Sequence, residues 1–201
     1  MKIKERQLEI IKAAGKILIE SGINGLTIKK LAEEMGFADS AVYRHFKCKE
    51  EIILTMLNYL EMIMKERIIN STKKIEDPVK QLRAIFDSYF EFFNQNPHFL
   101  IAIFSDGLFE NNKTLNESIN NLIKVGENYL LEIIQKGQSR QQFIQKISAS
   151  DLVQIIMGSI RLQILQWRLS RFAFDLKQNG SKLMESVLLL ISSESNKINE
   201  N

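Results

Sequence analysis

Apolar residues recur every three or four positions along most of the chain, which is the period of an amphipathic α-helix. In the first such segment, Ile10, Ala14 and Ile17 form one stripe. No stretch shows the strict apolar–polar alternation of a half-buried strand. The pattern therefore predicts an all-α protein of about nine helices. Their expected ranges are about 6–21, 27–35, 39–46, 50–69, 77–96, 97–109, 115–137, 148–170 and 181–192.

Residues with known preferences for helix ends support these boundaries. Gly22 suits the left-handed backbone that follows a helix, and Gly36 breaks the pattern of the second helix. Thr27 is a good N-cap for the second helix, and Asp77-Pro78 joins an N-cap to a proline in the first turn. Ser148 to Asp151 resembles a capping box with Asp in place of Glu.

Two short helices at 27–35 and 39–46 are joined by a turn that contains a glycine, which is typical of a helix-turn-helix. Val42 and Phe46 are expected to face inward, whereas Ser40, Tyr43 and Arg44 face outward. Such a helix fits the major groove of DNA. The spacing alone is equally compatible with an ordinary helical hairpin.

Charge distinguishes the first quarter of the chain from the rest. The net charge of the 201 residues is +3, and residues 1–50 contain ten Lys and Arg against seven Asp and Glu. The remaining residues are balanced, which is compatible with a polyanion-binding head on a neutral body. Apolar runs such as 187–191 are too short to span a bilayer, and no signal peptide precedes the first helix. We therefore expect a cytoplasmic protein without a membrane partner.

The segment LTIKKLAEEMGFADSAVYRHFKCKEEII resembles the DNA-binding signature of the TetR/AcrR family of one-component bacterial transcriptional regulators. Its most specific elements are Leu31-Ala32, Gly36, the run from Val42 to Phe46, and Lys49-Glu50. The resemblance implies a helix-turn-helix head at 1–49 and a ligand-binding and dimerisation domain at 50–192, and the polar residues 193–201 predict a disordered tail. It further implies a homodimer that binds a palindromic operator in double-stranded DNA and responds to a small-molecule effector.

The resemblance also assigns roles to individual residues of the head. Thr27, Lys29, His45 and Lys49 would approach the phosphate backbone. The other predicted DNA contacts are Asp39, Ser40, Ala41, Tyr43 and Arg44. Two residues depart from the family pattern: Ala38 cannot cap the recognition helix, and Asp39 replaces a commonly neutral or basic residue. An acid at Asp39 could repel phosphate or accept a hydrogen bond from cytosine.

Aromatic residues are concentrated in the middle of the chain. Eight of the seventeen lie within positions 86–109, the last of them Phe109. They predict either a phenylalanine-rich core or an apolar effector pocket, and pockets of that kind are lined by aromatic residues with a few polar groups. The candidate lining residues are Phe86, Tyr89, Phe93, Phe104 and Trp167, with Arg161 or Gln163 as a polar contact. An apolar or acyl-bearing effector would suit them.

The last two long helices are candidates for a two-fold interface, as the family resemblance implies, although the same residues could pack within one chain. The candidates are Met157, Ile160, Ile164, Leu165, Leu169, Val187, Leu188 and Ile191. Dimerisation matters because two copies can read two half-sites about one DNA turn apart.

Other chemistry has little support in the sequence. His45 and His98 are the only histidines and Cys48 is the only cysteine, so we expect no metal site, no cofactor and no disulfide. Cys48 is either a passive small residue or a redox sensor. We expect a repressor in which the helix at 50–69 couples effector and DNA binding. The alternatives are an activator, a nucleoid-associated DNA binder without inducer, or a helical enzyme acting on an apolar substrate.

Overall fold

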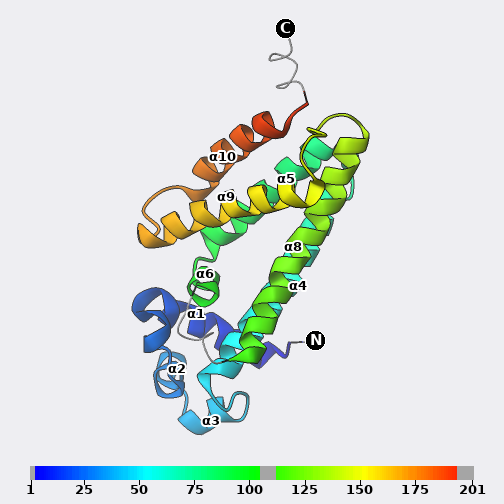
Figure 1. Cartoon of the computed structure of the whole chain (residues 1–201). Helices are drawn as coiled ribbons and strands as arrows, with labels where there is room; N and C mark the ends of the chain where they lie inside the picture. The colour runs from blue at the N-terminus through cyan, green and yellow to red at the C-terminus, as the bar shows by residue number, and fades with distance from the viewer. Residues whose placement is uncertain (1–2, 105–111, 194–201) are drawn as a thin grey trace. The chain divides into compact units, whose positions relative to one another are not determined.

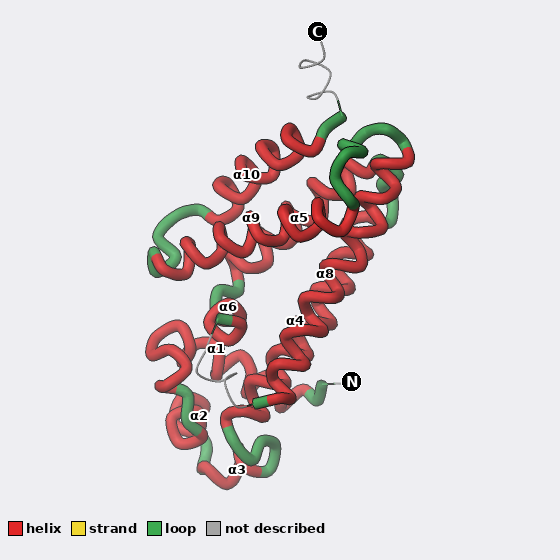
Figure 2. The backbone as a smooth tube through the Cα atoms, viewed as in Figure 1, coloured by secondary structure: helices red, strands yellow, loops and turns green. Residues whose placement is uncertain are grey.

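The computed structural model describes residues 3–104 and 112–193. The helices in these ranges are α1 (Glu5–Gly25), α2 (Ile28–Met35), α3 (Asp39–Tyr43), α4 (Lys49–Thr72), α5 (Pro78–Gln95), α6 (His98–Ile103), α8 (Lys113–Ser139), α9 (Ala149–Leu169) and α10 (Leu176–Ile191). Helices and connecting loops account for the whole described chain apart from one isolated antiparallel bridge between Phe143 and Ser192 (Figure 2). The expected all-α fold is confirmed.

The chain forms two compact units. Unit 1 contains residues 1–63 and 96–122, and unit 2 contains residues 64–95 and 123–201. Within unit 1, α1 packs against α2 and α6, and α2 packs against α3 (Figure 1). Within unit 2, α10 packs against both α5 and α9. The division falls inside α4 and α8, and α6 joins the head because it packs on α1. The functional boundary at residue 49 stays a prediction.

Most of the predicted helix-end signals act as expected, but Gly22 does not end the first helix. It has φ 63° and ψ −169°, which is outside the left-handed helical region, and α1 continues past this interruption to Gly25. The hydroxyl of Thr27 accepts a hydrogen bond from the Lys30 amide at 3.1 Å. Gly36 adopts the left-handed conformation after α2. The carboxylate of Asp77 caps α5, and the hydroxyl of Ser148 caps α9 by accepting from the amide of Asp151.

Several helix boundaries differ from the expected ones. α3 ends at Tyr43, although the Phe46 amide still donates to the carbonyl of Val42 at 3.0 Å and so continues the turn. α4 continues to Thr72. α8 begins at Lys113, inside the expected loop, because Asn112 caps it. Of the expected helix at 97–109, α6 accounts for 98–103, while 105–111, including Phe109, lie outside the described residues. The same holds for 194–201 of the expected tail.

The largest difference is at α10, which begins five residues before the expected start. Asp175 caps it by accepting a hydrogen bond from the amide of Gln178 at 2.9 Å. Gly180 lies in the second turn of this helix. A Cβ atom built on Gly180 would lie only 2.5 Å from the ring of Phe90 in α5. The glycine is therefore needed for close helix packing and not for a turn.

Polar pairs flank this close contact between α5 and α10. Arg83 pairs with Glu185, and the hydroxyl of Ser181 donates to the carboxylate of Asp87 at 3.0 Å. These pairs are largely exposed, so each contributes little to stability. Burial of Phe90 beside Gly180 is the main favourable contribution here. Among the described helices, none has the length and apolar character needed to cross a membrane.

The Phe90–Gly180 contact gives a direct test of the packing. Gly180→Ala is expected to lower the free energy of unfolding by about 1–3 kcal/mol, because the added methyl group overlaps a buried ring. Gly126→Ala is the matched control in α8, since its Cβ would meet only the methyl group of Met157 at 3.6 Å. The control is expected to gain up to about 1 kcal/mol from helix propensity. Urea unfolding of both variants measures the difference, and equal effects would contradict this packing.

Candidate nucleic-acid interface and effector site

The recognition helix α3 is held by its buried side. Val42 and Phe46 are 0% and 2% exposed, and Leu31 and Ala32 of α2 are fully buried in the same unit. The opposite side of α3 is open, and Tyr43 is 54% exposed. This arrangement matches a helix-turn-helix, in which the rear of the second helix packs against the first and its front is free to enter the major groove.

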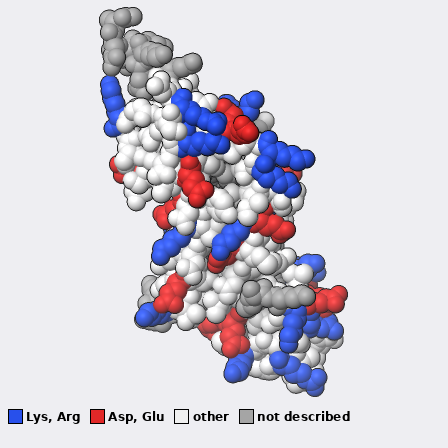
Figure 3. Space-filling model, turned by 90° about the vertical axis from the view of Figure 1, so that its right-hand side faces the viewer, with Lys and Arg blue, Asp and Glu red and all other residues white. Residues whose placement is uncertain are grey.

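All nine predicted DNA contacts lie in unit 1, on α2, α3, their flanking turns and the first residue of α4. Thr27, Lys29, Asp39, Ser40, Tyr43 and Arg44 are exposed, while Ala41, His45 and Lys49 are half-buried. On the face shown in Figure 3, Lys and Arg dominate the lowest part, which is the α2–α3 end of unit 1. Ala38 makes no side-chain cap, as its methyl group requires, and Asp39 is the acid in the first turn of α3.

The turn between α2 and α3 carries a contact that the sequence did not suggest. The guanidinium of Arg6 lies 4.9 Å from the ring centroid of Phe37, and Arg6 also pairs with Glu9 at 2.5 Å. Phe37 is 37% exposed, so the arginine covers part of an apolar surface. The beginning of α1 thus supports the turn that sets the direction of α3.

The aromatic residues of α5 form one connected cluster in unit 2. The rings of Tyr89 and Phe93 meet edge-on with centroids 4.6 Å apart, and Phe92 meets Phe93 in the same way at 5.3 Å. Phe86 continues the cluster through Phe90 at 6.4 Å. Phe86 and Phe93 are buried, whereas Tyr89 keeps part of its surface.

Tyr89 is the polar member of this cluster. Burial raises the pKa of its hydroxyl to about 12, although the positive charge of Arg161 acts in the opposite direction. Its side chain nevertheless retains accessible surface. The group is therefore a neutral hydrogen-bond donor at physiological pH, set among aromatic rings. That combination suits a mainly apolar ligand that carries an acceptor.

The other predicted effector residues have different surroundings. The indole of Trp167 donates to the carbonyl of Phe174 at 2.7 Å and meets the ring of Phe172 at 4.7 Å, so it closes the loop after α9. Gln163 is half-buried and Arg161 is exposed on the same helix. Phe104 belongs to unit 1, so only part of the predicted set shares one unit.

The predicted interface residues divide between buried and exposed positions. Five are at most 5% exposed within the single chain, namely Ile160, Ile164, Val187, Leu188 and Ile191. Met157 and Leu165 are half-buried, and Leu169 is 71% exposed. The same helices expose four apolar residues that the sequence reasoning missed, namely Ile155, Leu162, Leu189 and Leu190. Ile155, Leu162 and Leu169 recur every seven positions, which is the signal that could have identified them.

Two family models match almost the whole chain. The model for bacterial regulatory proteins of the tetR family matches residues 10–56, and the model for the C-terminal region of YsiA-like proteins matches residues 57–193. The chain belongs to the TetR family. It is therefore a DNA-binding transcriptional regulator, as the resemblance of the 26–53 segment implied.

Individual relatives cover nearly the same length as this TetR-family chain. The fatty acid metabolism regulator protein of Bacillus subtilis (strain 168) is 24% identical over 194 residues, which cover 96% of this chain and 98% of the relative. The nucleoid occlusion factor SlmA of Vibrio vulnificus (strain YJ016) is 26% identical over 164 residues, covering 79% and 84%.

Solved structures share the fold of this TetR-family regulator. The fatty acid degradation regulator FadR from Bacillus halodurans aligns with a TM-score of 0.83 at 21% identity and covers 94% of this chain and 97% of its own. FadR from Bacillus subtilis in complex with stearoyl-CoA aligns with a TM-score of 0.79 at 24% identity, covering 94% and 99%.

The surroundings of Cys48 make it a poor redox sensor. Burial and the carboxylate of Glu50 raise the pKa of the Cys48 thiol, which disfavours the reactive thiolate.

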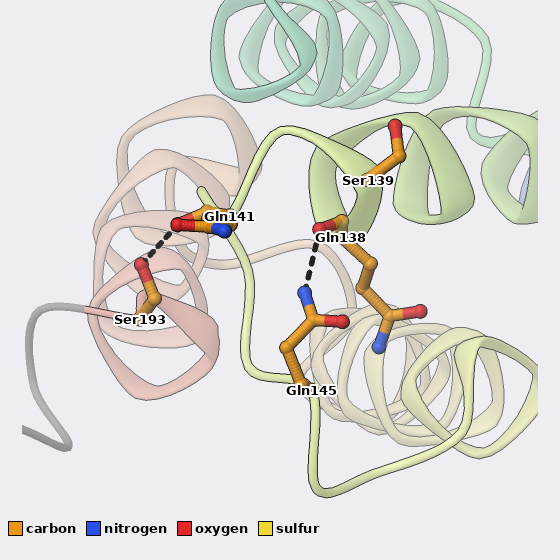
Figure 4. Close-up of a pocket in the computed structure, with 5 residues that line it drawn as sticks. All are labelled: Gln138, Ser139, Gln141, Gln145 and Ser193. Carbon is orange, nitrogen blue, oxygen red and sulfur yellow. Dashed lines mark hydrogen bonds between the residues drawn. The ribbon is translucent and has the colours of Figure 1, made fainter.

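A polar pocket of about 460 Å³ lies beside the loop after α8 (Figure 4). It is lined by Gln138, Ser139, Gln141, Gln145 and Ser193. The amide of Gln145 donates to the carbonyls of Gln138 and Phe143, so it fastens the loop after α8. Amides and hydroxyls do not match the apolar effector that the sequence predicts.

His98 begins α6 and faces α1. A Cβ atom on Gly15 would lie 2.9 Å from the imidazole, and the ring of Phe99 lies 4.4 Å away. Burial lowers the pKa of His98 to about 4. Among the described residues, no group of three or more His, Cys, Asp or Glu side chains could hold a metal ion. His98 therefore serves as a neutral packing residue between α6 and α1.

The low pKa of His98 predicts a specific loss of stability in acid. An unfolded histidine has a pKa of about 6.5, so the unfolded chain takes up this proton first as the pH falls. Between pH 6.5 and 4 the free energy of unfolding should decrease by as much as about 3 kcal/mol from this group. Urea unfolding across this range should show a smaller decrease for His98→Gln. Equal slopes would show that the imidazole is not buried in solution.

Proposed function

We propose that the chain is a cytoplasmic, homodimeric repressor that leaves a palindromic operator when an effector with a long apolar chain binds to unit 2. The observation that carries the effector class is the aromatic cluster of α5 around the Tyr89 hydroxyl. The similarity to a regulator whose structure contains stearoyl-CoA supports the same class. An acyl thioester combines the apolar chain and the polar acceptor that these side chains suit.

The DNA contacts follow from exposure and chemistry in unit 1. Tyr43 and Arg44 are exposed on α3, where they would meet bases or backbone, and Ser40 lies one turn earlier. Lys29 precedes α3 in the chain and Lys49 follows it, and both positively charged side chains would contact phosphate. Since half or more of protein–DNA hydrogen bonds go to phosphate and sugar, most of these residues fix register and few select sequence.

Dimerisation would use the exposed apolar side of α9 and α10. Leu162 and Leu169 are 56% and 71% exposed, and Leu189 and Leu190 are 68% and 75% exposed. Exposed large apolar side chains on two helices that pack against each other are candidates for an interaction surface. A second copy of the same surface is the natural occupant because a two-fold dimer delivers two recognition helices to one operator. The buried residues of the predicted set would support this surface from behind.

The coupling between effector and DNA would run through α4. Its first residue, Lys49, is a predicted phosphate contact in unit 1, and its last turns pack on α5 through Arg67 in unit 2. An effector changes operator affinity only if it binds the two states of the regulator with different affinity. A rigid displacement of α4 would change the separation of the two heads, whereas the half-site spacing of DNA is fixed.

The similarity to SlmA favours a second candidate, a nucleoid-associated DNA binder that needs no effector. The aromatic cluster would then be core alone. The two candidates differ in the response to acyl compounds, which the effector experiment below measures. We propose no catalytic role for either.

Arg44→Gln is expected to weaken operator binding roughly tenfold through the loss of a phosphate contact in each protomer. The slope of log K against log salt concentration should fall in magnitude by about two, because a dimer loses two contacts. Arg171→Gln is the matched control, since Arg171 lies in the exposed loop after α9 of unit 2. Fluorescence anisotropy with the chain's own upstream DNA measures both. An unchanged slope would show that Arg44 does not contact phosphate. Sedimentation of the protein as a monomer would contradict the proposed dimer.

Stearoyl-CoA is expected to release the wild-type chain from the same DNA, with coenzyme A lacking the acyl chain as the control. It should also stabilise the free protein by about 2.7 kcal/mol at one hundred times its Kd, because it binds the native state alone. Anisotropy and thermal unfolding provide the two readouts. DNA binding that persists at saturating stearoyl-CoA would favour the effector-independent candidate.

A further inference from the structure

Arg67 in the second half of α4 is held against α5 in an unusual way. Its Nη2 donates to the backbone carbonyl of Ser88 at 2.9 Å, and its guanidinium carbon lies 5.3 Å from the ring centroid of Phe92. Its Nε is buried and has no hydrogen-bond partner. The side chain as a whole is half-buried. The guanidinium plane is therefore fixed by a carbonyl and a ring while one of its donors stays unused.

Among the described side chains, none provides a counter-ion for the charge of Arg67. Within residues 3–104 and 112–193, no carboxylate lies within 4.0 Å of it, whereas Arg83 on the neighbouring helix pairs with Glu185. Removing a guanidinium from water without a paired anion costs free energy, and so does an unsatisfied buried donor. A ring and a single carbonyl compensate only part of that cost. An anion that reached the buried Nε donor would supply the rest.

The aromatic residues beside this charge form a continuous series of ring contacts, in which Phe92 and Phe93 are buried. Phe92 contacts Phe93, and Phe93 contacts Tyr89, so ring contacts lead from Arg67 along α5 to the Tyr89 hydroxyl. All of these residues belong to unit 2. Guanidinium forks bind carboxylate and phosphate oxygens with directed, charge-assisted hydrogen bonds. The arrangement thus places a fixed cation at one end of the aromatic cluster and the partly accessible Tyr89 at the other.

We propose that Arg67 binds the anionic group of an effector whose apolar chain lies along the aromatic cluster of α5. This rests on the proposed function, because it assigns the polar end of the same effector. The anion is a carboxylate, as in a fatty acid, or a phosphate, as in an acyl-CoA; both present negatively charged oxygens to the guanidinium. The competing role is a mechanical one, in which Arg67 only fastens α4 to α5.

The experiment compares three probes of equal chain length with the full-length protein, namely myristate, myristoyl-CoA and uncharged tetradecanol, each below its micelle concentration. Calorimetric titration gives their affinities for wild type, Arg67→Gln, Arg67→Lys and the control Arg83→Gln. Wild type should prefer an anionic probe to tetradecanol. Arg67→Gln should weaken binding of the anionic probe roughly ten- to a hundredfold and leave the affinity for tetradecanol unchanged. Arg67→Lys should keep part of the preference for the anionic probe over tetradecanol, because lysine retains the charge but lacks the planar guanidinium fork. Arg83→Gln should keep the whole preference.

The pattern of losses separates the sources of the anion. A loss for myristate indicates the carboxylate, and a loss confined to myristoyl-CoA indicates phosphate. If Arg67→Gln does not fold, the test uses the wild-type protein alone. Its affinity for the anionic probe is then expected to fall with added salt, whereas its affinity for tetradecanol does not.

Three results would overturn the proposal. If Arg67→Gln weakens all three probes equally, Arg67 only fastens the helices. If wild type binds tetradecanol as tightly as the anions, the effector needs no charge, although the proposed function stands. If wild type binds its DNA but none of the probes, the effector class and the role of Arg67 both fail while DNA binding remains.

Discussion

The packing of Phe90 against Gly180 is the contact on which unit 2 depends. A helix pair can approach this closely only where one member lacks a side chain, and Gly180 supplies that place in α10. The ring of Phe90 fills the space and is fully buried. Because interiors are packed at nearly crystalline density, this contact fixes how far α5 stands from α10. It therefore also fixes which side of α5 is available for anything else.

With one side of α5 committed to α10, its remaining aromatic residues take other partners. Tyr89 and Phe93 pair with each other, and Phe92 lies under Arg67 of α4. The core interpretation of the aromatic segment holds for Phe90, which is fully buried. The pocket interpretation, which concerns Tyr89 on another side of α5, stays a proposal.

Most of the fold could be predicted from the sequence, because it depends on local signals. Helical periodicity and caps such as Thr27 and Ser148 act over three or four residues, and the structure places them as expected. The role of Gly180 could not be inferred from local signals, because it depends on a ring ninety positions earlier in the chain. The buried and exposed sides of α9 could not be separated for a similar reason. Ile164 and Leu162 are equally apolar, and only the position of α10 and other neighbours decides which is covered.

The candidate sites divide in the same way. The residues of the head could be named because the helix-turn-helix confines them to one short segment with a recognisable pattern. Arg67 could not, because an arginine on an amphipathic helix is ordinarily a solvated surface residue, and nothing in its neighbours marks it as lacking an anion. What distinguishes it is the absence of a carboxylate among the described side chains around it, together with the ring of Phe92 beneath it.

The two ends of α4 place a positive charge in different surroundings. At Lys49 a cation is useful because DNA brings its own anions, and water screens the lysine until it binds. At Arg67 the cation lies against an aromatic ring and its Nε donor is buried without a partner, so the guanidinium destabilises the effector-free protein. An anionic effector that relieves this cost gains affinity that an uncharged chain cannot obtain. A regulator built in this way would respond to amphiphilic anions and ignore neutral lipids, although both fit the same aromatic surface.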